Sequence, residues 1–398
     1  MELPLDIQKI ISCLAQANHE AFVVGGCVRD FLQNKRPKDW DITTSATPTQ
    51  MRAALKNYKL VPTGEQYGTL TVVVNSESYE LTTYRADGNY TDGRRPDSVL
   101  FSKHLKEDLK RRDFTINAMA YNTETGLVDL FGGFLDLQNK IIRCVGNPND
   151  RFKEDALRIM RAVRFACHLN FSIAKETQQA IFENGEKLKN VSQERITAEL
   201  ITILKKRNKN IRPVIEYIIK TTISQDIHAK VIDALFTIKT EDIEILLAII
   251  FSNIENPKDI LFQKKLDNKT INNTCVLIEN RYTQMLATKP AAKHMLKNFG
   301  HDICLKLLQI RQLDLGDTKN DISQLETIWQ QIMQNNEPYK ISHLNISGTD
   351  IMAMGIPQGK HIGQILEHCL NVVIDNPSKN TKPHLHKEVL CIKESLRI

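Results

Sequence analysis

The first third of the chain mixes stretches with strand spacing and stretches with helix spacing. Residues 1–20 carry apolar side chains on one helical face and are predicted to form a single amphipathic helix. A short buried strand follows over Ala21–Val24, then a diglycine turn, a second helix, and a second strand that opens at residues 39–41. Two more strands are expected over residues 69–75 and 79–85. This order predicts an α+β head domain with a mixed or antiparallel sheet and helices.

The remaining two thirds of the chain show helical spacing almost throughout, and the sequence therefore predicts an all-α second part. A chain of 398 residues is long enough for about two to four domains. We accordingly expect a head over residues 1–140, a helical neck over 141–205, a helical body over 206–320 and a helical tail over 321–398. Within the tail, a Gly-Ile-Pro break at residues 355–357 is expected to separate two helices.

Two stretches combine helical spacing with clustered charge. Residues 103–120 are predicted to form one helix, which contains the run Arg111-Arg112-Asp113. Residues 150–169 are predicted to form another, and at about 100° per residue its apolar residues fall on one face and its arginines on the other. Most helices with an arginine face are simply solvated, so the periodicity alone does not separate that interpretation from a functional one.

The spacing of Asp155 and Arg158 gives the second of these helices a candidate chemistry. They lie one helical turn apart, so a carboxylate acceptor and a guanidinium donor can meet one flat base edge. Cytosine and adenine both present an amino donor beside an acceptor and fit this pair, whereas uracil and guanine present the opposite groups. Each wrong pairing costs about 1–3 kcal/mol. The pattern predicts a surface that accepts CTP and ATP and refuses UTP and GTP.

Asp39 and Asp41 are the candidate metal ligands. Residues two apart in a strand point to the same face, so the two carboxylates would lie side by side. Two such charges repel unless cations lie between them, and Mg²⁺ ions completed by substrate phosphates are a common solution. Gly25 and Gly26 let backbone N–H groups approach phosphate oxygens, and Arg29 can bind a phosphate. The alternative is an acidic surface strand beside an ordinary tight turn.

Composition bears on the partner and the compartment. The formal net charge of +6 suits a nucleic-acid partner. Eight cysteines are scattered singly, without a C-x-x-C pair, which favours reduced thiols in a cytoplasm over disulfides or a zinc site. The N-terminus has no signal-peptide core, and no apolar run approaches the roughly 18 residues of a membrane span. We therefore expect a soluble, cytoplasmic protein with no membrane partner.

Several motifs resemble those of the tRNA nucleotidyltransferase and poly(A) polymerase family. The pattern GG-x-VRD…DWDI over residues 25–42 resembles its head-domain signature, and RRD and ED-x-x-R resemble its nucleotide-binding motifs. Glu194-Arg195 matches a further motif that supports the base-reading helix. Residues 86–98 resemble the loop of members that add the terminal adenosine and are expected to act as a lid, a long surface connection being the alternative. The chain is similar to the bacterial class II, Gram-positive-type CCA-adding enzymes.

The resemblance implies roles for individual residues. Asp39 and Asp41 would bind two Mg²⁺ ions, with Glu80 on a neighbouring strand as a third catalytic carboxylate; an ordinary exposed strand glutamate is the alternative for Glu80. Asp113 would accept a hydrogen bond from the ribose 2′-OH. The complete nucleotide-binding set that the resemblance implies is Gly26, Arg29, Arg112, Asp113, Asp155, Arg158, Arg161 and Arg164.

The activity that the resemblance implies is template-independent addition of C, C and A to the 3′ end of tRNA, from CTP and ATP with Mg²⁺. The helical half would bind the tRNA by shape and phosphate contacts, and a homodimer is compatible with the sequence. Alternatives are the A-adding half of a split system, a poly(A) polymerase, and a non-catalytic RNA-binding protein. Residues 60–70 lack the arginine-rich motif of the polymerases, and a binding protein has no need of the Asp39–Asp41 pair.

Overall fold

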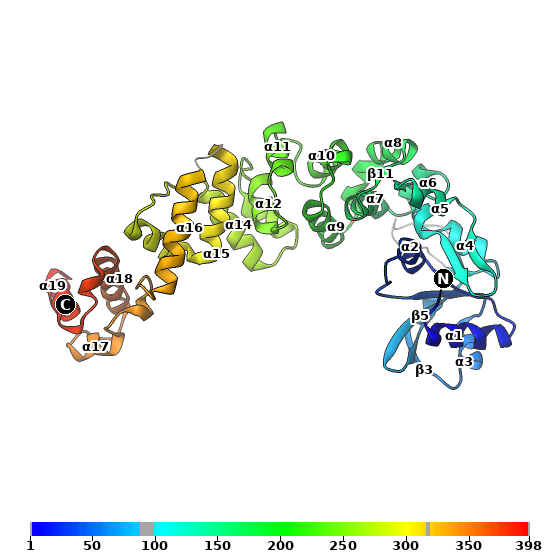
Figure 1. Cartoon of the computed structure of the whole chain (residues 1–398), viewed down its shortest axis with the longest axis horizontal. Helices are drawn as coiled ribbons and strands as arrows, with labels where there is room; N and C mark the ends of the chain where they lie inside the picture. Colours follow the sequence, from blue (N-terminus) through cyan, green and yellow to red (C-terminus); the bar gives the residue numbers. More distant parts are fainter. Residues whose placement is uncertain (1, 88–98, 316–318, 397–398) are drawn as a thin grey trace. The chain divides into compact units, whose positions relative to one another are not determined.

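The computed structural model describes residues 2–87, 99–315 and 319–396. The chain forms two compact units: one contains residues 1–228 and 260–266, and the other contains residues 229–259 and 267–398. All the strands in the described ranges belong to the first unit, and the second unit is helical (Figure 1). The finer division into head, neck, body and tail stays a prediction, and most of the expected lid, from residue 88 on, lies outside the described residues.

A seven-stranded sheet forms the centre of the N-terminal part. Its strand order is β3-β4-β5-β2-β1-β8-β9. The strands β2 and β5 are parallel and every other neighbouring pair is antiparallel, which confirms the predicted mixed sheet. The strands are β1 (Ala21–Val24), β2 (Asp41–Thr44), β3 (Lys59–Gly64), β4 (Thr69–Val74), β5 (Glu77–Thr83), β8 (Met119–Asn122) and β9 (Gly126–Asp129).

Two small ladders and a set of helices complete the first unit. β6 (Arg85–Asp87) pairs with β7 (Val99–Phe101), and β10 (Ile141–Ile142) pairs with β11 (Ser172–Ile173). The helices up to residue 222 are α1 (Leu5–Gln16), α2 (Gly26–Leu32), α3 (Pro48–Ala54), α4 (Leu105–Lys110), α5 (Gly133–Gln138), α6 (Pro148–Glu154), α7 (Leu157–Leu169), α8 (Lys175–Asn184), α9 (Gln193–Lys205) and α10 (Arg212–Thr222).

The second strand differs from the prediction. It begins at Asp41, so Asp39 lies in the loop before the strand and the two residues are not neighbours on one strand face. The antiparallel ladder with β1 runs from Ala21 opposite Thr44 to Val23 opposite Ile42, and then β1 ends as the chain turns into α2. Residues 39 and 40 therefore have no partner in β1, and the backbone there is free to leave the extended form.

The prediction of a single helix over residues 103–120 was wrong. Helix α4 ends at Lys110, a short 3₁₀ turn covers Thr115–Asn117, and Met119 begins strand β8. Strand β8 lies between β1 and β9 in the sheet and bonds to both. Pairing with two neighbours outweighs the helical spacing of the apolar residues, because each strand residue gains ladder hydrogen bonds as well as burial.

The helix predicted over residues 150–169 is interrupted at Asp155. Helix α6 ends at Glu154, Asp155 is extended with φ −144° and ψ 106°, and α7 starts at Leu157. Asp155 is therefore not on the helix from which its angular position was predicted. The apolar face of α7 is nevertheless as expected, since Ile159, Met160 and Val163 are fully buried.

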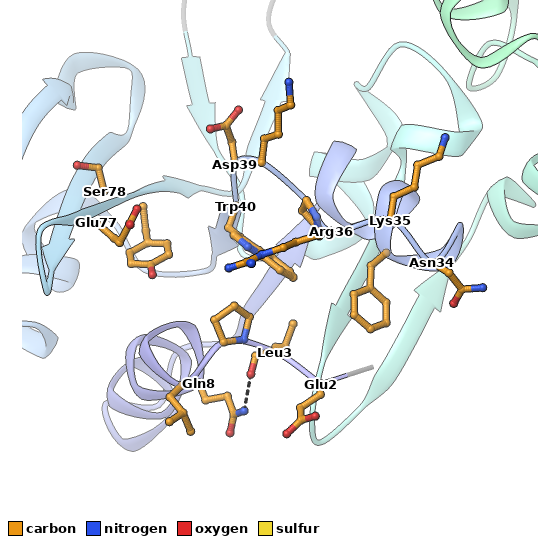
Figure 2. A pocket seen from close by; sticks show the side chains of 16 residues that line it. Glu2, Leu3, Gln8, Asn34, Lys35, Arg36, Asp39, Trp40, Glu77 and Ser78 are labelled. Carbon is orange, nitrogen blue, oxygen red and sulfur yellow. Dashed lines mark hydrogen bonds between the residues drawn. The ribbon is translucent and has the colours of Figure 1, made fainter.

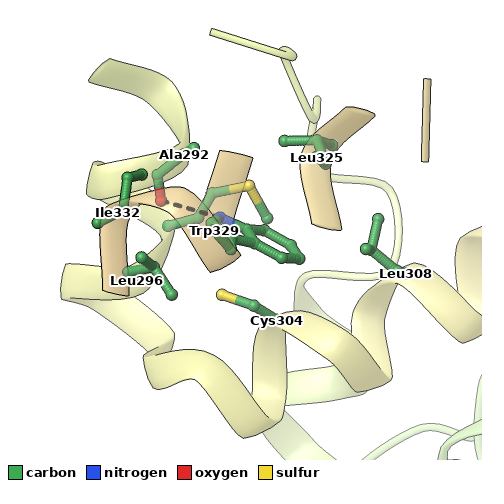
Figure 3. Close-up of a cluster of buried hydrophobic side chains, with 8 residues drawn as sticks. Ala292, Leu296, Cys304, Leu308, Leu325, Trp329 and Ile332 are labelled. Carbon is green, nitrogen blue, oxygen red and sulfur yellow. Dashed lines mark hydrogen bonds between the residues drawn. The ribbon is translucent and has the colours of Figure 1, made fainter. Parts of the chain in front are cut away.

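The second unit is built from helices packed around separate cores. One core surrounds the fully buried Trp329, whose indole N–H donates to the carbonyl of Ala292 over 3.1 Å (Figure 3). The break at residues 355–357 lies between α17 and α18, as predicted. The remaining helices are α11 (Ala229–Thr237), α12 (Ile243–Ile250), α13 (Pro257–Gln263), α14 (Asn268–Glu279), α15 (Lys289–Leu315, kinked at Gly300), α16 (Lys319–Gln334), α17 (Gly348–Ala353), α18 (Lys360–Asp375) and α19 (Lys382–Leu396). Of these, α13 belongs to the first unit from residue 260 on.

Two global properties follow from the described part of the chain. None of its helices has both the length and the apolar character needed to cross a bilayer. All eight cysteines are free thiols, and burial raises the pKa of several of them, to about 11 for Cys27. A raised pKa keeps a thiol protonated and unreactive near neutral pH.

Candidate active site

Three carboxylates meet at the start of β2. Asp41 is the first residue of this strand and lies opposite Glu80 of β5 in the parallel ladder, and Asp39 precedes it by two residues. Asp41 is partly exposed to solvent, but desolvation by the surrounding protein raises its pKa. The positive charge of Arg112 lowers this pKa, while the negative charges of Glu80 and Asp39 raise it further. The charges of Glu80 and Asp39 thus both act on Asp41, and a bound cation would relieve that repulsion.

The carboxylates suit a metal ion that takes only some of its ligands from the protein. Over the described ranges, no group of three or more His, Cys, Asp or Glu side chains is spaced to hold a metal ion by itself. Mg²⁺ is commonly held by one or two carboxylates, with water and substrate phosphates completing its shell. Asp39 and Asp41 supply two hard oxygen donors next to the charge of Glu80, and these residues fit that arrangement.

A cavity of 890 Å³ opens beside Asp39 (Figure 2). The loop of residues 34–40 lines one side, and the starts of α1 and β5 line the other. Figure 2 shows the side chain of Asp39 directed away from Trp40. Lys35, Arg36 and Lys38 are exposed on this loop and make the rim basic, which suits contact with a phosphodiester backbone.

The turn between β1 and α2 brings the diglycine and two arginines together. Gly25 has φ of 81°, a conformation that favours glycine. A Cβ at this position would lie 2.9 Å from an NH1 atom of Arg112, so the missing side chain also leaves room for that guanidinium. Gly26 is the first residue of α2, and Arg29 lies in the same short helix with its NH1 donating to Asn117 over 2.7 Å.

A buried carboxylate that the sequence analysis missed fixes Arg112. Asp108 is fully buried and accepts from Arg111 at 2.7 and 3.0 Å and from Arg112 at 3.1 Å. Burial alone would raise the pKa of Asp108, but the two guanidinium groups outweigh burial and lower it. The Nε of Arg112 is buried and has no hydrogen-bond partner in the described structure, which leaves a donor for a ligand oxygen.

Protein groups already use both oxygens of Asp113. Its Oδ1 accepts from the backbone N–H of Phe114 at 2.8 Å and from the amide of Asn117 at 3.1 Å. Its Oδ2 accepts from Nε and NH2 of Arg161 at 2.9 and 2.6 Å, and this pair lowers the pKa of Asp113 against the effect of burial. Asp113, which was predicted to accept a hydrogen bond from the ribose, therefore also holds the side chain of Arg161.

Different partners hold Asp155 and Arg158. Asp155 accepts from the N–H of Leu157 at 2.9 Å and from Arg195 at 3.0 Å. Arg158 donates to Glu154 at 2.6 Å and to the carbonyl of residue 111 at 3.2 Å. The Glu194-Arg195 motif was predicted to support this helix, and Arg195 does contact Asp155 just before α7.

The arginine face of α7 is paired and not simply solvated. Arg158, Arg161 and Arg164 each meet a carboxylate, and Arg164 donates to Glu199 of α9 over 2.5 Å. Of these carboxylates only Glu199 was not expected from the sequence, because it lies 35 residues away along the chain from Arg164. Asn117, a polar residue in a mostly apolar run, and Phe165, which directly follows Arg164, were not expected from the sequence either.

Three family models match successive parts of the chain. Residues 21–143 match the family model described as "Poly A polymerase head domain", which contains the carboxylates and the diglycine turn. Residues 170–227 match the model for the RNA- and SrmB-binding site of polymerase A. Residues 236–389 match a model of tRNA nucleotidyltransferase domain 2. The matches thus extend from the sheet through both compact units.

Relatives that match over nearly the whole chain include two CCA-adding enzymes. The chain is 36% identical over 400 residues to the CCA-adding enzyme of Oceanobacillus iheyensis, covering 97% of each chain. It is 33% identical over 386 residues to the CCA-adding enzyme of Lactobacillus johnsonii, covering 94% of each. Among solved structures, the Bacillus stearothermophilus CCA-adding enzyme in complex with CTP matches with a TM-score of 0.78 at 27% identity, covering 100% of this chain and 99% of that one.

Proposed function

The chain belongs to the CCA-adding enzyme family, and from that premise we propose which residues carry out its reaction. The protein is a nucleotidyltransferase that adds C, C and A to the 3′ end of tRNA from CTP and ATP without a template, and releases pyrophosphate. The observation that carries our assignment of the site is the meeting of Asp39, Asp41 and Glu80 beside the diglycine turn and Arg112.

We assign metal binding to Asp39 and Asp41 and take Mg²⁺ as the ion, because both side chains offer hard oxygen donors and the pKa of Asp41 stays raised, by burial first, despite the opposing charge of Arg112. Bound there, two Mg²⁺ ions would activate the tRNA 3′-hydroxyl for in-line attack on the α-phosphate and stabilise the departing pyrophosphate. Glu80 lies opposite Asp41 and strengthens cation binding through its negative charge.

The nucleotide is held by residues of α2 and of the segment that follows α4. Backbone N–H groups at Gly26 and the guanidinium of Arg29 contact the triphosphate. Arg112, with its unpartnered Nε, binds an oxygen on the sugar–phosphate side, where Asp113 faces the ribose. A carboxylate has about four acceptor sites, and Phe114, Asn117 and Arg161 fill those of Asp113, so a 2′-hydroxyl binds there only by replacing one of these donors.

Asp155 and Arg158 read the base, with Arg161 and Arg164 extending the basic surface beside it. The carboxylate of Asp155 accepts from the amino group of cytosine or adenine, and Arg158 donates to the adjacent ring acceptor. The helical second unit binds tRNA through its shape and phosphates. Cytoplasmic location, where tRNA matures among reduced thiols, and a homodimer remain predictions of the sequence.

The function is tested by extension of tRNA transcripts that end before CCA, after C and after CC, each with CTP, ATP, UTP or GTP and Mg²⁺. Two C and then one A should be added, with U and G refused. Addition of A alone to the CC-ended transcript would indicate half of a split system, and a long A tail on any RNA would indicate a polymerase.

The carboxylate assignment is tested by Asp41→Ala in the same assay. Nucleotide addition should disappear while tRNA binding, measured by gel shift, survives. Glu124→Ala is the matched control, because Glu124 is an exposed carboxylate between β8 and β9 of the same sheet and has no assigned role. Addition that persisted in Asp41→Ala would contradict the metal assignment.

A further inference from the structure

The side chain of Phe165 lies where three of the assigned arginines converge. Its ring centroid is 5.4 Å from the Cζ of Arg29, 5.4 Å from that of Arg161 and 4.2 Å from that of Arg164. Phe165 is only 8% exposed, and the side chains of Arg29 and Arg164 are mostly buried beside it, whereas Arg161 is more open to solvent. Aromatic rings attract cations through the negative charge of their faces, and the attraction is stronger where water is excluded.

The arginines around this ring come from distant parts of the chain. Arg29 belongs to α2 beside the diglycine turn, whereas Arg161 and Arg164 belong to α7. A hydrogen-bond chain joins the same two elements: Arg29 donates to Asn117, Asn117 donates to Asp113, and Asp113 accepts from Arg161. The ring and the chain thus connect the triphosphate side of the site with the base side by two separate routes.

Each of the three cations has its own carboxylate, and the ring is the contact that all three share. Arg29 pairs with Asp30, Arg161 pairs with Asp113, and Arg164 pairs with Glu199. The ring of Phe165 is itself held by an edge-to-face contact with Phe114, whose centroid lies 5.7 Å away at an interplanar angle of 77°. Phe114 is fully buried, so the ring has a fixed support from which to orient the guanidinium groups.

We propose that Phe165 is a positioning residue for the nucleotide: its ring aligns Arg29, Arg161 and Arg164 as one unit, so that both CTP and ATP depend on it. The inference rests on the proposed function, which assigns these arginines to the nucleotide. Because the ring acts through cations shared by both nucleotides, its loss weakens CTP and ATP together and leaves the carboxylates that bind the metal in place.

The test compares Phe165→Leu with Phe171→Leu in the full chain. Phe171 is 2% exposed, lies just after the same helix and has no role in the proposed site. Equilibrium binding of CTP and ATP is measured by calorimetry, together with KM, kcat and the midpoint of thermal unfolding. Phe165→Leu should raise Kd and KM for both nucleotides about tenfold, with a smaller change in kcat. Phe171→Leu should lower the unfolding midpoint and leave KM unchanged.

Two more variants separate alignment from filling of space. Phe165→Tyr keeps the ring and should restore Kd and KM to within about twofold of the unmodified chain. Phe165→Met fills the site without a ring and should behave as Phe165→Leu does, which provides a second measurement if the leucine variant does not fold. Equal KM values for the Phe165→Leu and Phe171→Leu variants would overturn the proposal while the unmodified chain still added CCA. If the unmodified chain added no nucleotide, the proposed function would fail, and calorimetry would decide the role of Phe165.

Discussion

Substitution of Asp155 can separate an effect on stability from an effect on base selection, because this residue has both a structural role and a proposed role in recognition of the base. Its Oδ1 accepts from the first N–H of α7 at 2.9 Å, and its Oδ2 pairs with Arg195 at 3.0 Å. Losing a carboxylate that satisfies a helix-start N–H costs about 1 kcal/mol. The pair with Arg195 is part-buried, with side-chain exposures of 26% and 16%, so its loss costs about 1–2 kcal/mol, between surface and buried pairs.

Asp155→Ala is therefore expected to lower the free energy of unfolding by about 2–3 kcal/mol, or the midpoint by about 4–12 °C for a unit of this size. If the carboxylate also accepts from the base amino group, the preference for CTP and ATP over UTP and GTP should fall by about 5-fold to 150-fold. Asp155→Asn keeps an acceptor for Leu157 but adds an amide donor, so it should lose less stability and gain UTP incorporation.

The control is Asn147→Ala, which removes the side chain that accepts from the backbone N–H of Asn149 at the start of α6. This change should also cost about 1 kcal/mol and leave base selection unaltered. The assays are urea unfolding and single-nucleotide extension of tRNA with each of the four triphosphates. The reasoning is refuted if Asp155→Ala unfolds more easily but refuses UTP and GTP as firmly as the unmodified chain.

Three further predictions concern the packing around the site and in the second unit. Because the folded-state pKa of Asp108 is lowered, its ionisation stabilises the fold above about pH 4 and this contribution is lost as the pH falls through the folded-state pKa. In thermal unfolding between about pH 5 and 2, Asp108→Asn should thus show a shallower acid dependence than the unmodified chain, and an equal slope would contradict this. Gly133→Ala should lower the free energy of urea unfolding by about 1–3 kcal/mol, since its Cβ would lie 2.2 Å from the backbone oxygen of Thr115. Trp329→Phe should cost about 1–3 kcal/mol, because a buried carbonyl loses its donor. Trp40 would then be the only tryptophan, and an unchanged maximum of the tryptophan emission would show that Trp329 is not buried in solution.

Local patterns in the sequence were enough to predict the general architecture. Alternating strand and helix spacing predicted a mixed sheet followed by helices, and the break at residues 355–357 predicted the boundary between two tail helices. Motifs of a few residues identified the family, because a diglycine turn, a carboxylate pair and an ED-x-x-R run each require particular residues at short spacing. Such features depend on neighbours within about one or two turns, and the sequence lists those neighbours directly.

The tertiary structure decided what the arginines and carboxylates of the site contact. Helical spacing predicted a helix over residues 103–120, but pairing with β1 and β9 made its end a strand. Arg29 and Asn117 are 88 residues apart, and Arg161 and Asp113 are 48 residues apart, yet both pairs are hydrogen-bonded. Periodicity shows which face a charge lies on but not which distant residue meets it there. That choice follows from the burial of charged groups, which are stable in the interior only beside a partner that folding of the whole unit supplies.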